Sequence, residues 1–85
     1  MTAAPVFDPQ AIAVGRAVRA ALAGAGLTQA EAAIAAGISL QTLSRRINGQ
    51  MPFTWPELVR IANVTEVGVT ELAASAVRIA EKESA

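Results

Sequence analysis

The spacing of apolar residues along the 85-residue chain predicts a bundle of helices. Val14, Val18 and Leu22 recur at every fourth position and therefore lie on one face of a helix. Asp8, which is followed by a proline, is a suitable N-cap for that helix. The glycines within residues 24–26 predict its end. The seven residues before Asp8 are expected to form a flexible tail.

Two short helices are predicted next, separated by a tight turn. Thr28 and Glu31 have the spacing of a capping box, in which each side chain bonds the other residue's backbone N–H. They open a helix over about residues 28–36. Gly37 suits the left-handed residue that ends a helix, and Ser39 suits the N-cap of the helix that follows.

The helix predicted over about residues 39–48 has two faces of opposite character. Its apolar stripe consists of Leu40, Leu43 and Ile47. Its polar stripe consists of Gln41, Ser44, Arg45 and Asn48. Both sets follow the spacing of one helix face, so we expect the apolar stripe to be buried and the polar stripe to be exposed.

Two further helices complete the predicted fold. Thr54 and Glu57 form a second capping box at the start of a fourth helix. A fifth helix is expected to continue into the charged C-terminal tail. We therefore predict an all-α fold of five helices, with residues 8–75 as the domain and residues 76–85 as a helical extension or tail.

The composition leaves few residues for catalysis. The chain has no cysteine and no histidine, which excludes disulfides, cysteine-bound zinc and the commonest general base. We therefore expect no enzyme activity, no cofactor and no metal. There is no run of about 18 apolar residues, so a membrane-spanning helix is not expected. A cytoplasmic protein without a membrane partner is predicted.

The charge is balanced overall but uneven along the chain. Seven basic and seven acidic residues give a net charge of zero, so the total charge gives no argument for a nucleic-acid partner. Between Glu31 and Glu57, however, there is no acidic residue, and Arg45 and Arg46 lie within that gap. An electropositive surface is expected there.

The polar stripe consists of residue types that read DNA. Arginine bonds the O6 and N7 edge of guanine, glutamine bonds the N6 and N7 edge of adenine, and each good pair gives about 1–3 kcal/mol of discrimination. Ser44, Asn48 and Arg46 suit contacts with phosphate oxygens. Two adjacent arginines taken alone are more often a solvated pair, so this interpretation depends on the wider motif.

The wider motif extends over most of the chain. Its residues are Gly26-Leu27-Thr28-Gln29, Ala33, Gly37, Ser39, Leu43, Asn48-Gly49, Pro52-Phe53-Thr54, Glu57-Leu58, Ile61-Ala62 and Val69-Thr70-Glu71-Leu72. Together they resemble the XRE, or lambda-repressor and Cro-like, helix-turn-helix family over about residues 14–74. The resemblance implies a compact five-helix lambda-repressor-like domain whose third helix lies in the major groove of DNA.

The resemblance also implies roles for individual residues. It implies contacts with the DNA backbone for Gln29, Ser39, Thr42 and Asn48. It implies base contacts for Leu40, Gln41 and Arg45, with Leu40 meeting a thymine methyl group. The family usually has an apolar residue at the position of Arg46, and this departure is expected to leave Arg46 free at the side of the helix to bind phosphate.

These features predict a sequence-specific transcriptional regulator, of the phage or prophage repressor or Cro-like type, that occupies a double-stranded DNA operator. No small-molecule ligand is expected. A homodimer is expected, at least on DNA, because Val77 and Ile79 have no evident place in the core. The alternative is a helix-turn-helix bundle that binds a protein, such as an antitoxin or antirepressor component, which the zero net charge favours.

Overall fold

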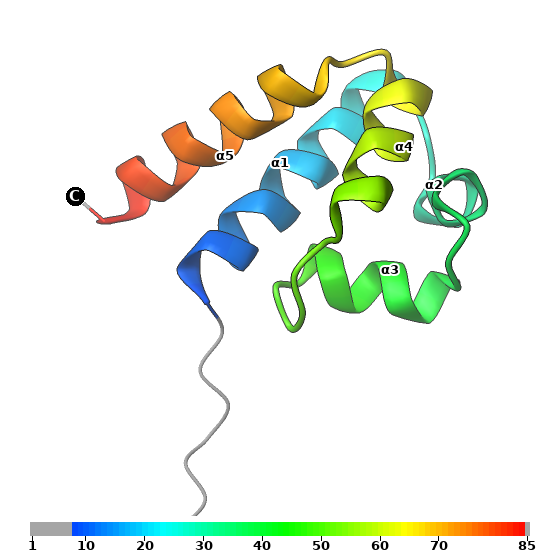
Figure 1. Ribbon diagram of the computed structural model, residues 1–85, viewed down its shortest axis with the longest axis horizontal. Helices are drawn as coiled ribbons and strands as arrows, with labels where there is room; N and C mark the ends of the chain where they lie inside the picture. Colours follow the sequence, from blue (N-terminus) through cyan, green and yellow to red (C-terminus); the bar gives the residue numbers. More distant parts are fainter. Residues whose placement is uncertain (1–7, 85) are drawn as a thin grey trace, which may run out of the picture.

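Five α-helices make up the part of the chain that the computed structural model describes, residues 8–84, and this part contains no strand. The helices are α1 (Pro9–Ala25), α2 (Gln29–Ala36), α3 (Leu40–Ile47), α4 (Trp55–Thr65) and α5 (Val69–Ser84). Each predicted helix is present (Figure 1), so the all-α fold expected from the sequence is confirmed. The predicted N-terminal tail lies outside the described residues.

Side chains cap the helices where the sequence predicts. The Asp8 carboxylate accepts a hydrogen bond at 2.8 Å from a backbone N–H in the first turn of α1. Thr28 and Thr54 each form a complete capping box with the glutamate three residues later. The Ser39 hydroxyl accepts a bond at 3.1 Å from the backbone N–H of Thr42. These bonds satisfy N–H groups that have no partner within the helix, which determines where each helix begins.

The last helix runs back along the first. α1 and α5 lie side by side in opposite directions (Figure 1). Leu72 and Ala76 of α5 are buried, and Ile79 packs against the core as a partly buried side chain. The expectation that Ile79 has no place in the core is therefore wrong, whereas Val77 is 52% exposed. The segment expected as an extension continues α5 without a break as far as Ser84.

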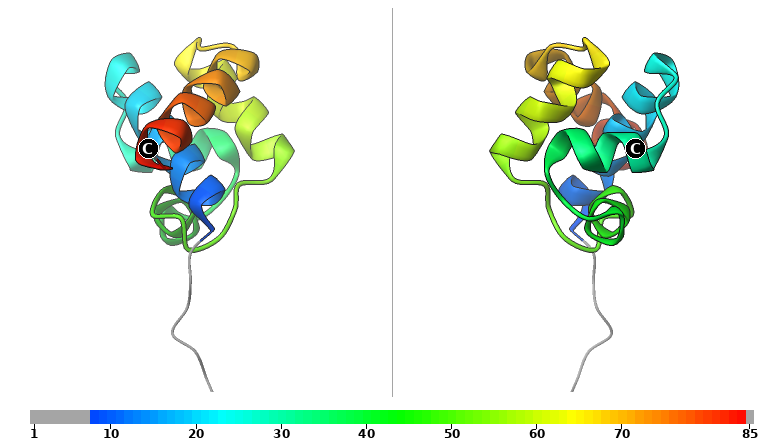
Figure 2. Two further views of the ribbon diagram at one scale, coloured as in Figure 1. Left: turned by 90° about the vertical axis from the view of Figure 1, so that its left-hand side faces the viewer. Right: turned by 90° about the vertical axis from the view of Figure 1, so that its right-hand side faces the viewer.

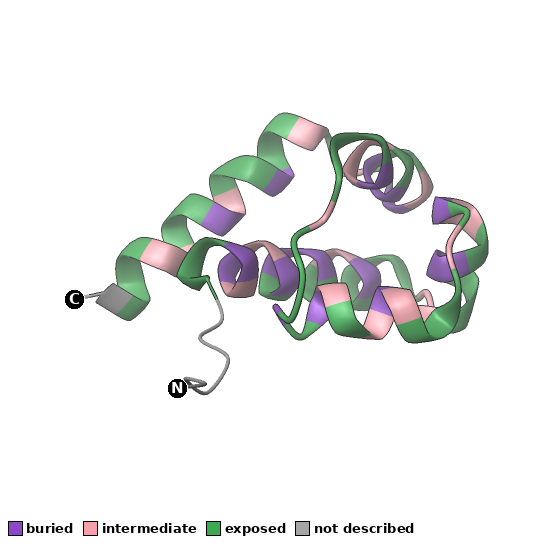
Figure 3. Cartoon of the chain, turned by 60° about the horizontal axis from the view of Figure 1, so that its bottom comes forward, coloured by how far each residue is buried: buried purple, intermediate pink, exposed green. Residues whose placement is uncertain are grey.

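The core between the helices is built largely from small side chains. Buried positions concentrate on the inward faces of the helices (Figure 3). The largest fully buried side chains, one each from α1, α3 and α4, are Val18, Leu43 and Ile61. The buried residues of α2 are Ala32, Ala33 and Ala36. Because these side chains are small, the backbone of α2 lies close to its neighbours.

α1 and α3 cross with their backbones almost in contact. Gly15 is buried in the middle of α1, and a Cβ atom added to it would lie 2.1 Å from the carbonyl oxygen of Ile47. A side chain does not fit in this gap. Glycine within a helix costs about 1 kcal/mol relative to alanine, so the close crossing explains why glycine is needed here. The crossing fixes α3 against the body of the domain.

None of the described helices is by itself both long and apolar enough to span a membrane. α1 and α2 together have the length and composition of a span, but the chain bends by 109° between them. Both helices contribute buried alanines to the core of the domain.

We predict that Gly15→Ala lowers the free energy of unfolding by about 2 kcal/mol, because the added methyl group forces α1 away from α3. Gly24→Ala is the matched control, since a Cβ atom at this other glycine of α1 meets nothing within 4 Å. The control is expected to raise the free energy of unfolding by about 0.5–1 kcal/mol. Urea denaturation measures both effects, and equal changes in the two variants would contradict the close crossing.

Candidate nucleic-acid interface

α2 and α3 form a helix-turn-helix pair at one edge of the molecule. α2 ends at Gly37, whose φ of 73° lies in the left-handed region, and Ser39 caps α3 after one intervening residue. Glycine adopts this conformation without the steric penalty that a side chain brings, which allows the tight turn. α3 lies at the lower edge of the molecule, level with the first turn of α1 and below α2, α4 and α5 (Figures 1 and 2).

The polar and apolar stripes predicted for α3 separate in the structure except at Leu40, which is exposed, and Ser44, which is partly buried. Leu43 and Ile47 are 0% and 3% exposed and anchor α3 on the core. Gln41 and Arg45 are exposed, and neither forms a hydrogen bond or an ion pair through its side chain with any described residue. Leu40, expected in the apolar stripe, is instead 50% exposed. The outward face of α3 therefore presents one amide, one guanidinium and one apolar side chain.

The residues with implied backbone contacts lie around that face. Gln29 is the first residue of α2 and is partly buried. At the start of α3, the Ser39 hydroxyl donates a hydrogen bond to the Thr42 hydroxyl oxygen at 2.9 Å. Ser44 is partly buried within α3, and Asn48 is the exposed C-cap of this helix. The structure thus places these residues on α3, at both of its ends, and at the start of α2.

Arg46 differs from the expectation of a free phosphate ligand. Its Nε lies 2.8 Å from Oε1 of Glu57, and its side chain is 17% exposed. Its Nη1 donates a hydrogen bond to the carbonyl oxygen of Pro52 at 2.8 Å. The guanidinium is therefore paired within the protein and not free at the side of the helix, and it gives the buried carboxylate of Glu57 the charge partner that such a group needs.

Glu57 connects α3 to the start of α4. The Glu57 side chain is 7% exposed, and its Oε1 also accepts a hydrogen bond from the backbone N–H of Thr54 at 2.9 Å. One carboxylate therefore caps α4 and binds Arg46 of α3. The sequence shows the capping box but not the ion pair. The only sequence signal for that pair is an arginine at a position where the resemblance leads one to expect an apolar residue.

Two further arginines support the helix-turn-helix from other helices. Arg60 of α4 donates from its Nη1 to the carbonyl oxygen of Ala36 at 3.1 Å, at the C-terminal end of α2. Arg19 of α1 donates from its Nη2 to Oδ1 of Asn48 at 3.1 Å. Both bonds join residues far apart in the sequence. The Arg60 bond satisfies a backbone carbonyl at the C-terminal end of α2, and the Arg19 bond holds the side chain of the α3 C-cap.

Glu31 lies in the first turn of α2, and its side chain is held by the hydrogen bonds of the capping box. The backbone N–H and the hydroxyl of Thr28 hold the pKa of the Glu31 carboxyl below its usual range, because both hydrogen bonds favour the charged form. Glu31 is therefore ionised at neutral pH. A negative charge in the first turn of a helix also interacts favourably with the helix dipole.

Comparison with known proteins identifies the same elements. A family model described as "Helix-turn-helix domain" matches residues 13–74. Two solved structures of the clp gene regulator ClgR from Corynebacterium glutamicum have a similar fold. One gives a TM-score of 0.84 at 22% identity, covering 94% of this chain and 82% of that chain. The other gives a TM-score of 0.76 at 24% identity, covering 88% and 94% respectively. A comparison with curated protein sequences found no match.

We predict that Arg46→Gln lowers the free energy of unfolding by about 2–4 kcal/mol, because it leaves the buried carboxylate of Glu57 without its charge partner. Arg45→Gln is the matched control, since it removes the same charge from the neighbouring exposed position and is expected to change stability by less than about 0.5 kcal/mol. Urea denaturation at neutral pH compares the two variants. Equal stability of both would show that the ion pair does not hold α3.

Proposed function

Because the chain belongs to the helix-turn-helix domain family, we propose that it is a transcriptional regulator that binds a specific double-stranded DNA operator. The observation that carries this proposal is the outward face of α3. Gln41 and Arg45 are exposed there and have no partner among the described residues, while Leu43 and Ile47 hold the helix from behind. The regulator acts by occupying its site, in the manner of a phage or prophage repressor or a Cro-like protein.

Three side chains of α3 read bases in the major groove. Arg45 bonds a guanine and Gln41 an adenine, because their planar groups match the donor and acceptor patterns of those base edges. Leu40, at 50% exposure, meets a thymine methyl group. These three side chains project from a helix that the core holds in place. Their positions on the domain are therefore set before DNA binds.

A second set of side chains contacts the phosphate backbone and sets the register of the complex. It consists of Gln29, Ser39, Thr42, Ser44 and Asn48. Such contacts position the protein but carry no sequence information themselves. Arg46 contributes indirectly, because its ion pair with Glu57 holds α3 against the start of α4.

The net charge of zero limits how tightly one copy binds, because phosphate neutralisation supplies much of the affinity for DNA. We therefore propose that the regulator binds a palindromic operator as a homodimer, with half-sites about 34 Å apart, one turn of the duplex. Exposed apolar side chains on α4 and α5 support a contact between copies. Trp55 is 64% exposed and Val77 is 52% exposed.

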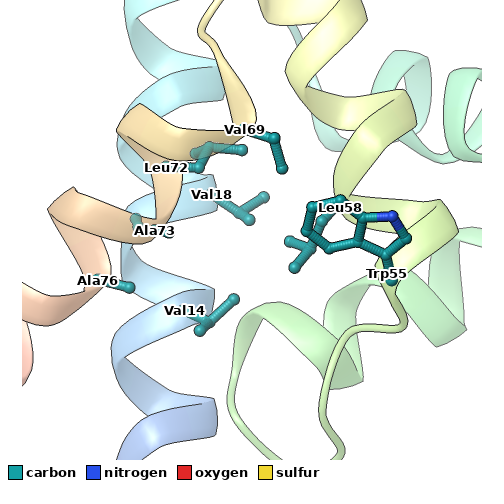
Figure 4. Close-up of a pocket in the computed structure, with 9 residues that line it drawn as sticks. Val14, Val18, Trp55, Leu58, Val69, Leu72, Ala73 and Ala76 are labelled. Atoms are coloured by element: carbon teal, nitrogen blue, oxygen red, sulfur yellow. The ribbon is translucent and has the colours of Figure 1, made fainter.

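The alternative function is a protein-interaction module, of the antitoxin or antirepressor kind. An apolar pocket of about 90 Å³ favours it. Val14 and Val18 of α1, Trp55 and Leu58 of α4, and Leu72 of α5 surround this pocket (Figure 4). A module of this kind would show little salt-dependent binding to duplex DNA, whereas a regulator shows strong salt dependence.

The DNA-binding proposal also implies that the protein acts in the cytoplasm and has no catalytic role.

We predict that Arg45→Ala and Gln41→Ala each lose about 1–3 kcal/mol of preference for the operator over random duplex. Selection from random duplex DNA supplies the operator, and gel shifts measure the binding. Arg78→Ala, which removes an exposed arginine from α5, is the control and is expected to keep the preference. Unchanged discrimination in Arg45→Ala would show that the reading face is assigned wrongly.

We predict that the protein sediments as a dimer at micromolar concentration when bound to its operator, and that Val77→Asp weakens this dimer because it places a charge on the apolar contact. Glu81→Gln on the same helix is the control and is expected to leave the dimer intact. A strict monomer with and without operator would rule out the homodimer.

A further inference from the structure

A basic cleft lies beside the C-terminal end of α3, outside the reading face. It has a volume of about 260 Å³ and is lined by Ile12, Arg16, Arg19, Ile47 and Asn48. Three of its side chains therefore come from α1, and the other two from the last residue of α3 and its C-cap. Neither arginine belongs to the set of DNA contacts predicted from the sequence.

The polar groups of the cleft have donors to spare. Arg19 Nη2 donates to Oδ1 of Asn48 at 3.1 Å. A guanidinium has five N–H donors and a side-chain amide has two. The single bond between these groups uses one of the donors and fixes their relative position. The remaining donors suit an anion with several acceptor oxygens.

Arg16 is held by the opposite end of the chain. Its Nη1 forms an ion pair with Oε2 of Glu83, near the C-terminal end of α5. The Arg16 side chain is 55% exposed and that of Glu83 is 39% exposed. An ion pair this exposed contributes little stability, so a stronger anionic partner displaces the carboxylate easily.

We propose that Arg16 and Arg19, together with Asn48 of the phosphate-contact set, form a second phosphate-binding site for the DNA backbone, and that Glu83 competes with the phosphate for Arg16. The inference rests on the proposed function, because it needs α3 in the major groove. A phosphate strand borders the groove on each side of a bound helix. The contact of Gly15 with Ile47 keeps the cleft at a fixed position relative to the reading face.

The competing carboxylate gives the site a distinctive energetic signature. An arginine that is free before binding gives its full interaction to the phosphate, whereas Arg16 must first leave Glu83. Removing the Glu83 charge therefore strengthens binding, and removing an arginine of the cleft weakens it. Both effects are independent of sequence, because phosphate contacts carry no base information.

The experiment measures the dissociation constants of the whole chain for the operator and for random duplex at several salt concentrations, by fluorescence anisotropy. Arg16→Gln and Arg19→Gln are expected to weaken binding to both duplexes by about three- to tenfold. They should also flatten the slope of log K against log salt by about 1 per protomer. Glu83→Gln is expected to strengthen binding to both duplexes by about two- to fivefold.

Two charge-matched variants of α5 serve as controls. Arg78→Gln and Glu81→Gln remove the same charges from residues outside the cleft and are expected to change binding by less than about twofold. The gain in Glu83→Gln keeps the test valid if an arginine variant folds poorly, because misfolding does not raise affinity.

The outcomes separate this inference from the proposed function. If the wild-type chain binds duplex DNA but Arg19→Gln behaves like Arg78→Gln, or Glu83→Gln behaves like Glu81→Gln, the cleft is not a phosphate site and the proposed function stands. If Arg19→Gln weakens the operator alone, Arg19 takes part in base reading and the assignment to phosphate is wrong. If the wild-type chain binds no duplex at any salt concentration, the proposed function fails and this inference fails with it.

Discussion

The position of α3 depends on one contact, the crossing of α1 over its C-terminal end. α3 has eight residues, too few for an isolated helix to be stable in water. Its stability and its orientation therefore come from packing. Leu43 and Ile47 supply the buried apolar surface, and Gly15 lets the two backbones approach so closely that α3 has little freedom to rotate or slide. The reading face points outward because the opposite face is fixed this way.

Polar contacts hold α3 at its other side and at its end. The ion pair between Arg46 and Glu57 connects it to α4, and the bond between Arg19 and Asn48 connects its C-cap to α1. These contacts leave some arginines available for DNA and use others to hold the fold. Arg45 is exposed and unpaired among the described residues, whereas Arg46, its neighbour, is held by a buried carboxylate. A domain with zero net charge therefore has few cations available for phosphate, and their placement matters more than their number.

Local sequence patterns predicted much of this structure. Four helices begin at a residue whose side chain bonds a backbone N–H group two or three residues further along the chain. These residues are Asp8, Thr28, Ser39 and Thr54. Such bonds can be predicted from the sequence because both partners are close along the chain. The opposite characters of the two α3 stripes follow from helical spacing in the same way. The residues of the candidate site could be named for this reason, although their roles in binding DNA are still predictions.

Contacts between distant segments were not predictable from those patterns. Arg46 was expected to be free because it replaces the apolar residue that the family resemblance implies at its position, and nothing local shows that Oε1 of Glu57 lies 2.8 Å from its Nε. The expectation for Ile79 was wrong for a related reason, since its burial depends on α5 running back along α1. Crossing angles and distances between helices decide these contacts, and such angles arise from the packing of many side chains together.

The proposed function requires that the outward face of α3 meets DNA while the apolar surface of α4 and α5 does not. The most direct measurement follows backbone amide chemical shifts of the ¹⁵N-labelled protein as the selected operator duplex is added. We expect the largest shifts to fall on Gln29 and on residues 39–48, and to saturate together at one stoichiometry. Shifts confined to Trp55 and α5, with those of α3 unchanged, would contradict it.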